Sequence, residues 1–242
     1  MTAQHVVVLT GAGVSADSGV RTFRDAGGLW EGHRVEDVAT PDGWDADPRL
    51  VWRFYQERRG QLRTVQPNAA HTALATFARA ARAAGHTFTL VTQNVDDLHQ
   101  RAGSEVLAMH GELQKLRCEQ CGLVLVDTLH VDPGRFVPCP ECAHARLRPH
   151  IVWFGEMPFF MPEIERALAR CTQFVAIGTS GQVYPAAGML AQARARGAVT
   201  WVQALEAPTN LTPGDRFRPG RATEVVPQLL GELASALSLR WP

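Results

Sequence analysis

Short apolar runs rich in β-branched residues recur along the chain and predict buried strands. The first covers residues 5–10 (HVVVLT) and leads directly into a glycine turn. Further runs lie at residues 88–92, 174–180 and 199–204. Continuous apolar runs of this length are typical of strands that other elements cover on both faces. The pattern therefore predicts a parallel sheet in the interior of the protein.

Stretches with helical periodicity separate these runs. They lie at residues 69–84, 161–170, 183–196 and 227–239, and the first and third end just before a glycine, a common helix C-terminal signal. Strands that alternate with helices favour connections that cross over a parallel sheet. We therefore predict the α/β class, with a Rossmann-like parallel sheet and helices on both of its faces.

Two insertions interrupt this alternation and predict a second, smaller domain. Residues 25–66 contain an amphipathic stretch, residues 48–62, that Pro48 can begin as a helix. Residues 113–148 carry four of the five cysteines. We expect a helical module in the first insertion and a zinc-binding module in the second. The Rossmann-type domain is then discontinuous and consists of residues 1–24, 67–112 and 149–242.

The composition excludes several classes of protein. Hydrophobic residues make up 45% of the chain, which argues against intrinsic disorder. Lys and Arg number 24 and Asp and Glu also number 24, so no net charge attracts nucleic acid or an anionic membrane. No apolar run approaches the roughly 20 residues of a membrane span, and the first residues lack the basic segment of a signal peptide. We expect a cytoplasmic monomer that binds neither membranes nor nucleic acid.

Four cysteines form two CxxC pairs, Cys118 with Cys121 and Cys139 with Cys142. Two such pairs about 15 to 20 residues apart predict a tetrahedral zinc site in a cytosolic chain. Four protein ligands leave no open position for a substrate, so the predicted zinc ion is structural. A redox dithiol is the alternative, but neither pair has a thioredoxin-like βαβ context.

The glycine turn carries the strongest sign of a nucleotide site. Residues 11–16 (GAGVSA) satisfy the relaxed G-x-G-x-x-A pattern between a strand and an expected helix. The alternative is a glycine turn that serves only tight packing. Glu36 and Asp37 have the spacing of the usual ribose-binding acid but do not end a strand, which disfavours an ordinary nicotinamide dehydrogenase. Arg21 and Arg24 lie close enough in sequence to meet phosphate or ribose oxygens.

Six motifs then occur in a fixed order along nearly the whole chain. They are GAGVSADSGVRTFRDAGGLW (residues 11–30), TQNVDDLH (92–99), MHGEL (109–113), the two CxxC pairs, RPHIVWFGE (148–156) and GTSGQVYPAA (178–187). This ordered set resembles the sirtuins, which are NAD-dependent protein lysine deacylases. The resemblance implies a Rossmann-type domain joined to a small domain of zinc and helical modules.

The resemblance also implies roles for individual residues toward NAD. Gln93, Asn94 and Asp96 resemble the polar residues that face the nicotinamide ribose and carboxamide, although Asn94 or Asp96 also suits a helix cap. His110 resembles the general base, since imidazole titrates near neutrality. The full set of expected NAD contacts is Gly11, Ala12, Gly13, Ser15, Arg21, Thr22, Phe23, Arg24, Gln93, Asn94, Val95, Asp96, Gly178, Thr179, Ser180, Glu206 and Ala222.

The resemblance to the sirtuins implies the following reaction. The acyl carbonyl oxygen of a modified lysine attacks the anomeric carbon of the nicotinamide ribose and expels nicotinamide, leaving an alkylimidate. His110 then activates the ribose hydroxyl that attacks this species, and water completes the release of free lysine and 2′-O-acyl-ADP-ribose. Zinc takes no part in these steps.

The substrate is expected to be an acyl-lysine protein segment bound as an extended strand between the domains. The expected contacts are Val152, Phe154, Gly155 and Val183. Tyr55 and Arg58 form a Tyr-x-x-Arg pair that resembles the signature of class III sirtuins, which remove succinyl and malonyl groups, and Ala39 resembles the small residue that admits a longer acyl chain. The alternative is that Tyr55 packs in the core while Arg58 belongs to a solvated face.

One departure from the family and two rival functions stay open. Ala204 stands where the family usually has an asparagine next to the adenosine of NAD, and alanine supplies no amide hydrogen bonds. Glu206 and Ala222 are carried over from the same region. The nearest rival function is protein ADP-ribosylation at the same site. The other is a non-enzymatic NAD-sensing or nucleic-acid-binding module.

Overall fold

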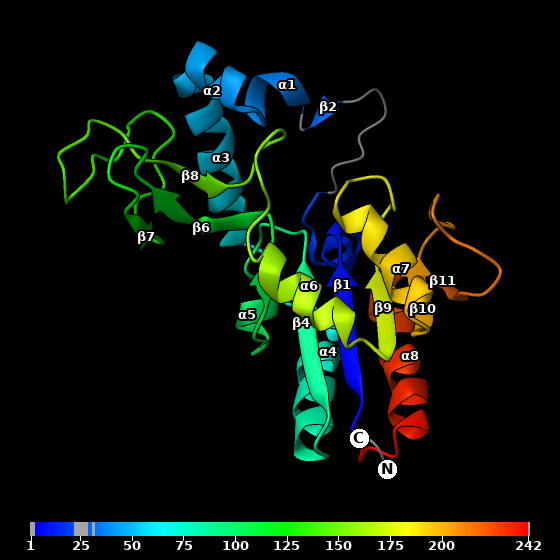
Figure 1. Ribbon diagram of the computed structural model, residues 1–242. Helices are drawn as coiled ribbons and strands as arrows, with labels where there is room; N and C mark the ends of the chain where they lie inside the picture. Colours follow the sequence, from blue (N-terminus) through cyan, green and yellow to red (C-terminus); the bar gives the residue numbers. More distant parts are fainter. Residues whose placement is uncertain (1–2, 22–28, 31, 242) are drawn as a thin grey trace.

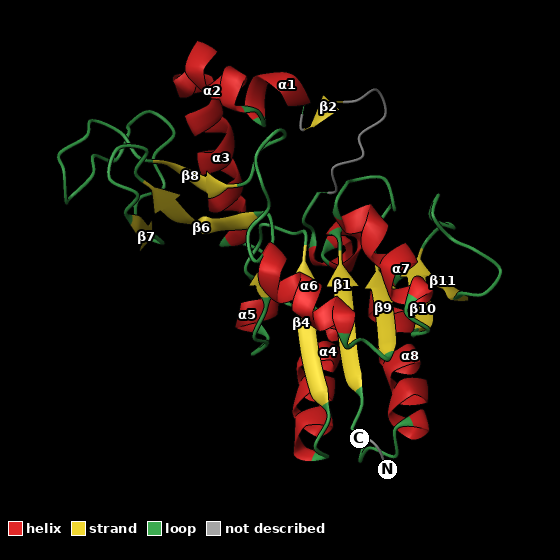
Figure 2. Ribbon diagram, viewed as in Figure 1, coloured by secondary structure: helices red, strands yellow, loops and turns green. Residues whose placement is uncertain are grey.

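The computed structural model describes residues 3–21, 29–30 and 32–241 of the chain. Within these residues the largest sheet has six strands in the order β11-β10-β9-β1-β4-β5, and all neighbouring strands are parallel. The strands are β1 (His5–Thr10), β4 (Thr87–Thr92), β5 (Leu107–Ala108), β9 (Gln173–Ile177), β10 (Val199–Ala204) and β11 (Arg216–Pro219). The predicted α/β class is confirmed (Figure 2).

Helices cover both faces of this sheet, as predicted. On one face α4 (Ala69–Ala83) and α8 (Ala222–Ala236) share an apolar core with Val6 and Val8 of β1. On the other face α6 (Met161–Ala169) and α7 (Ala186–Ala195) share a core with Val7 and Leu9. Successive side chains of a strand point to opposite faces, so the unbroken apolar run of β1 supplies both cores.

Several predicted boundaries differ from the structure. β9 ends at Ile177, and Gly178 turns the chain away from the sheet with a positive φ of 61°. α7 begins at Ala186 rather than at residue 183. α8 begins at Ala222 and contains Pro227, where the sequence predicted its start. The apolar residues of its first turns pack into the core, which outweighs the backbone hydrogen bond that proline cannot make.

The remaining elements form a smaller unit at the carboxyl end of the large sheet (Figure 1). A three-stranded antiparallel sheet has the order β7-β6-β8. Helix α3 has the predicted bounds, Pro48–Leu62. The elements are β2 (Leu29–Trp30), β3 (His33–Arg34), α1 (Val35–Val38), α2 (Pro41–Ala46), α3, β6 (Gly111–Arg117), β7 (Val124–Val126) and β8 (Arg148–Ile151). Helix α5 (Leu98–Arg101) instead lies beside α4 and the large sheet (Figure 1).

One apolar core joins the predicted helical and zinc modules. Trp44 of α2, Trp52 of α3 and Trp153 after β8 are each at most 2% exposed and belong to this core. Strands β6 and β8 extend across the expected domain boundaries at residues 112/113 and 148/149. The exact division of the chain stays a prediction. None of the helices in the described residues is long and apolar enough to cross a bilayer.

Candidate functional site

The glycine turn after β1 lies where the strand order changes direction. From β1 the chain proceeds to β4 on one side, whereas β9 lies on the other side. Parallel α/β sheets bind ligands outside the carboxyl ends of their strands at such a point. Gly13 N–H donates to the Gly178 carbonyl at 2.9 Å, and a Cβ on Gly13 would lie 2.7 Å from the Gly178 Cα. Gly13 therefore allows close packing of the two loops that follow β1 and β9.

The helix expected directly after this turn is absent from residues 12–18. The chain instead forms two short 3₁₀ helices, η1 (Ala12–Val14) and η2 (Ala16–Ser18), and Gly19 ends the second with a φ of 92°. The backbone bonds of the first turn join residues three apart, since Val14 N–H donates to the Gly11 carbonyl and Ser15 N–H to the Ala12 carbonyl. The expected α-helical N-terminus at this turn is therefore wrong.

Three of the expected NAD contacts form one buried polar cluster. The Ser15 hydroxyl donates to Asp96 Oδ2 at 2.9 Å and accepts from Asn94 Nδ2 at 3.1 Å. Their exposed fractions are 0%, 5% and 8%, respectively. Burial raises the pKa of Asp96, although a backbone N–H from Leu98 and the Ser15 hydroxyl oppose that shift. The cluster connects the loop after β1 with the loop after β4.

Two buried histidines beneath this cluster were missed by the sequence analysis. His99 Nε2 lies 3.0 Å from Thr10 Oγ1, and His71 Nε2 lies 3.4 Å from Ser15 Oγ. Burial lowers the pKa of His71 to about 4 and of His99 to about 3, so both rings are neutral near pH 7. The sequence held a signal for each of them. His99 is the last residue of the TQNVDDLH motif, and His71 stands three residues after Asn68, the spacing of a helix capping box.

His110 follows β5 and lies next to the loop after β4. Its Nδ1 is 3.0 Å from the Gln93 carbonyl oxygen. A carbonyl only accepts, so Nδ1 carries the proton and Nε2 is left with a lone pair. Burial lowers the pKa of His110, while the bond to Gln93 acts in the opposite direction. The ring is therefore neutral at pH 7 and able to accept a proton at Nε2.

The other expected NAD contacts are less uniform in their surroundings. Gln93 Nε2 lies 3.3 Å from Thr179 Oγ1, which links the loops after β4 and β9. Ala12, Val95 and Ser180 are half-buried, whereas Arg21 is exposed. Thr22, Phe23 and Arg24 lie outside the described residues.

The expected adenosine end is only partly brought to the site. Ala222 is 4% exposed at the start of α8, and Ala204 accepts from Gly220 N–H at 3.1 Å. Glu206 is exposed and makes no hydrogen bond or ion pair within the described residues. A contact that the sequence analysis missed joins this end to the glycine loop: Asp17 accepts from Arg221 Nη1 at 2.9 Å and from Thr223 Oγ1 at 2.8 Å.

The three residues expected to select the acyl group are all buried in the small unit. Tyr55 and Arg58 of α3 are 0% and 9% exposed, so the alternative of a solvated face for Arg58 is wrong. Arg58 stacks over Phe54, with its guanidinium carbon 3.2 Å from the ring centre. Ala39, also buried, accepts from Phe154 N–H at 2.9 Å. This bond places the end of α1 beside the loop that follows β8.

The expected peptide contacts occupy two separate loops. Val152 N–H donates to the His110 carbonyl at 2.9 Å, which places the loop after β8 next to the expected base. Phe154 is 47% exposed, and Gly155 has a φ of 91° that favours glycine. Val183 is half-buried before α7.

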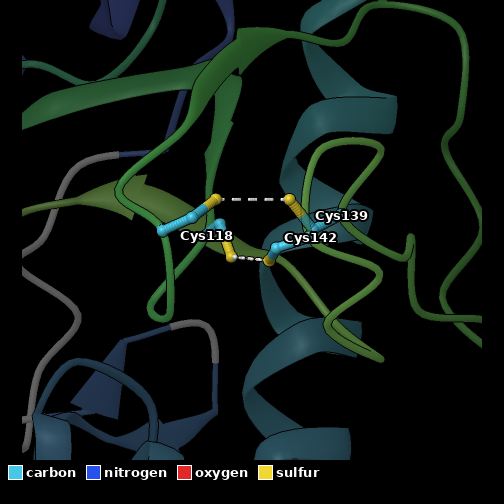
Figure 3. A group of neighbouring side chains, drawn as sticks. Cys118, Cys139 and Cys142 are labelled. Carbon is cyan, nitrogen blue, oxygen red and sulfur yellow. Dashed lines mark hydrogen bonds between the residues drawn. The ribbon is translucent and has the colours of Figure 1, made fainter.

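The four expected zinc ligands converge on one point (Figure 3). Their sulfur atoms all lie within 4.8 Å of one another, with Cys118 3.6 Å from Cys142 and Cys121 3.6 Å from Cys139. A set of four thiols at this spacing fits a tetrahedral zinc ion. Cys171 lies elsewhere and is buried beside β9.

Comparisons with known proteins agree with this geometry. The Sir2 family pattern matches residues 11–185. A protein of Escherichia coli called NAD-dependent protein deacylase is 53% identical over 239 residues, covering 96% of this chain and 83% of that protein. A protein of Salmonella typhimurium with the same name is 50% identical over 236 residues, covering 96% and 85%. The chain belongs to the Sir2 family.

Solved structures give the same result for the fold. A Sir2 homologue in complex with NAD is 37% identical with a TM-score of 0.84, and the match covers 96% of this chain and 90% of that one. The Sir2Af2 protein bound to a myristoylated histone peptide is 30% identical with a TM-score of 0.74, covering 97% and 92%.

Proposed function

We propose that this protein removes acidic acyl groups, such as succinyl and malonyl, from lysine side chains of proteins. The coarser activity is the one that its family and relatives carry: the chain is an NAD-dependent protein deacylase. The acyl preference rests on one observation, the burial of both Tyr55 and Arg58 on helix α3.

The burial of this pair supports a preference for a negatively charged acyl group. A carboxylate that reaches Tyr55 and Arg58 leaves water, and its lost hydration must be replaced by strong hydrogen bonds. A guanidinium can bind a carboxylate through two parallel N–H bonds, and a phenol can add a third. Burial raises the pKa of Tyr55, which keeps its O–H protonated as a donor. A neutral acetyl group offers no partner for these donors.

The surroundings of His110 support its role as the general base. The bond from Nδ1 to the Gln93 carbonyl fixes the tautomer whose Nε2 can take a proton. The lowered pKa keeps the ring unprotonated at neutral pH. In this role His110 removes a proton from a ribose hydroxyl of the bound co-substrate.

The residues that would hold NAD and zinc have separate tasks. Bound NAD supplies the ADP-ribose group that takes up the acyl group. The loops after β1, β4 and β9, with the buried cluster of Ser15, Asn94 and Asp96, would orient its ribose and nicotinamide ends. The four cysteines would hold zinc away from the reacting atoms and fix the small unit. An acyl-lysine segment would lie extended between Val152–Gly155 and Val183.

Nicotinamide release with matched succinyl-lysine and acetyl-lysine peptides tests this function. We expect the wild type to prefer the succinyl peptide by about 10- to 100-fold in kcat/KM, because charged hydrogen bonds are worth roughly 1.5–3 kcal/mol. Arg58→Met should abolish most of that preference while the acetyl reaction changes little. His110→Ala should remove about 100-fold or more of both activities.

Arg53→Met is the matched control, since Arg53 is an exposed arginine of the same helix. It should leave both reactions unchanged. Equal losses of the two activities in Arg58→Met would contradict the acidic pocket and keep the deacylase. Stable transfer of the ADP-ribose label from NAD to protein, with nicotinamide released but no acyl group removed, would favour the ADP-ribosyltransferase instead.

A further inference from the structure

Trp153 makes a hydrogen bond that determines how the Tyr55 hydroxyl can be used. Its indole Nε1 lies 3.0 Å from Tyr55 Oη, and both side chains are buried. An indole N–H only donates, so the phenol oxygen is the acceptor in this bond. Within the described residues no acceptor binds the Tyr55 O–H. The hydroxyl therefore keeps its own proton available for a bound group.

The orientation of the indole is itself fixed by an arginine and a carboxylate. The Arg148 guanidinium carbon lies 3.4 Å from the centre of the Trp153 ring. Arg148 also binds Glu156 through two N–H groups at 2.9 and 3.0 Å, and Glu156 accepts from the Trp153 backbone N–H at 2.8 Å. Burial opposes ionisation of Glu156, but these bonds outweigh it and its pKa lies below the usual value. Arg148 thus stacks on the face of the indole ring, and Glu156 binds the backbone N–H of the same residue.

This arrangement continues to the cysteine cluster. Glu119 stands between Cys118 and Cys121 and lies 3.8 Å from Arg148. The same carboxylate accepts from the Trp44 indole at 2.9 Å. Arg117 of β6 adds a 2.7 Å bond to Glu156. Side chains from α2, β6, β8 and the first cysteine pair therefore surround the Arg148–Glu156 ion pair that contacts Trp153.

We propose that Trp153 is a positioning residue for Tyr55 and a determinant of acidic-acyl selectivity. The indole N–H occupies the acceptor side of the phenol oxygen, which leaves the O–H to donate to the distal carboxylate of the acyl group. This inference rests on the proposed function, because it concerns the same acyl-binding pair. The acetyl group does not reach this bond, so loss of the indole N–H affects the acidic substrates selectively.

Trp153→Phe tests the proposal because it keeps an aromatic ring and removes the N–H. The kcat/KM for the succinyl peptide should fall about fivefold, in line with one neutral hydrogen bond, with the acetyl reaction changed less than about twofold. The loss should appear mainly in KM, because the distal carboxylate is bound before and during the reaction. In a Tyr55→Phe background, Trp153→Phe should no longer change the succinyl-to-acetyl ratio.

Trp52→Phe is the matched control for the loss of a buried indole bond. Trp52 is 1% exposed in the same core, and its Nε1 donates to the Asp132 carbonyl at 2.9 Å. It should lower stability to a similar extent and leave the succinyl-to-acetyl ratio unchanged. If Trp52→Phe and Trp153→Phe change the ratio equally, Trp153 has only a structural role and the proposal is overturned.

The outcomes separate the two proposals. A wild type that prefers succinyl, with an unchanged ratio in Trp153→Phe, overturns the role of Trp153 and keeps the proposed function. A wild type without any acidic preference overturns both. If Trp153→Phe does not fold, NMR of the wild type and of Tyr55→Phe decides: the Trp153 indole N–H should be protected from exchange and shift in Tyr55→Phe. A rapidly exchanging or unshifted resonance overturns the proposal.

Discussion

The loops proposed to hold NAD, called the NAD side, and the residues proposed to hold the acyl group, called the acyl side, are built on different principles. The NAD side consists of loops that follow parallel strands, and the backbone of Gly11, Gly13 and Gly178 sets their spacing. The acyl side is made of side chains from α1, α3 and the loop after β8, held by aromatic and arginine contacts. Close backbone approach, with a few buried polar bonds, therefore shapes the first part, whereas aromatic and arginine packing shapes the second.

This difference predicts which part tolerates sequence change. Loops at a strand switch point keep their place as long as the sheet forms, because the strands fix their ends. The acyl side depends on a small core whose elements are short, with α1 and α2 spanning only four and six residues. Such a core needs an additional constraint, and the four-cysteine cluster next to Glu119 supplies one.

Loss of the metal should produce the largest difference in local stability between the two sides. Cys139→Ser removes a buried ligand, and structural zinc contributes folding free energy directly. We expect hydrogen exchange to rise sharply in β6 and β7 while β1 and β4 stay protected, with deacylation lost. Cys171→Ser changes a buried thiol outside the cluster and should leave both patterns as in the wild type. Equal loss of protection in β1 and β6 would mean that the two sides fold as one unit.

Two buried histidines make the NAD side sensitive to acid. The folded-state pKa values of His99 and His71, about 3 and about 4, lie below the unfolded value of 6.5. The unfolded chain therefore takes up protons first as the pH falls below 6.5, and the free energy of unfolding decreases. From about pH 7.5 to about pH 5 each histidine should account for about 2 kcal/mol. Denaturant titrations at several pH values measure this slope.

His99→Asn should reduce by about one the number of protons taken up on unfolding, and so make the slope shallower. It should also lower stability at neutral pH. His130→Asn is the control, because the His130 side chain is 71% exposed. An unchanged slope in His99→Asn would show that His99 is protonated in the folded protein. The acid dependence would then arise from groups of the small unit, such as His150 of β8, whose pKa burial lowers to about 4.

On both sides of the site, long elements were predicted better than short ones, for a physical reason. β1, β10 and α3 have the bounds that apolar periodicity predicted, because each buries a continuous run or one face. Short elements such as α1 and β7 carry too few residues for a period to be visible. Periodicity also placed the start of α8 at Pro227, because it does not register apolar packing that carries a helix past a proline.

Contacts between side chains far apart along the chain were harder to predict from the sequence. The CxxC spacing predicted the cysteine cluster, since two short turns bring thiols together locally. The contact of Tyr55 with Trp153 joins positions 98 residues apart and depends on the packing of three aromatic elements. No local pattern encodes such a contact. The Asp17 to Arg221 pair, 204 residues apart, was missed for the same reason.

The smallest expected effect concerns the adenosine end, where Ala204 supplies no amide. Its side chain is 8% exposed at the end of β10, next to the backbone of Gly220. Ala204→Asn should lower the KM for NAD by about two- to fivefold, since one new neutral hydrogen bond is worth about 0.5–1 kcal/mol. Ala204→Leu has the same shape without the amide and should not lower it. Equal KM values of the two variants for NAD would show that backbone groups, rather than a side chain at this position, hold the adenosine. Backbone contacts would then be the main contacts along the whole NAD side.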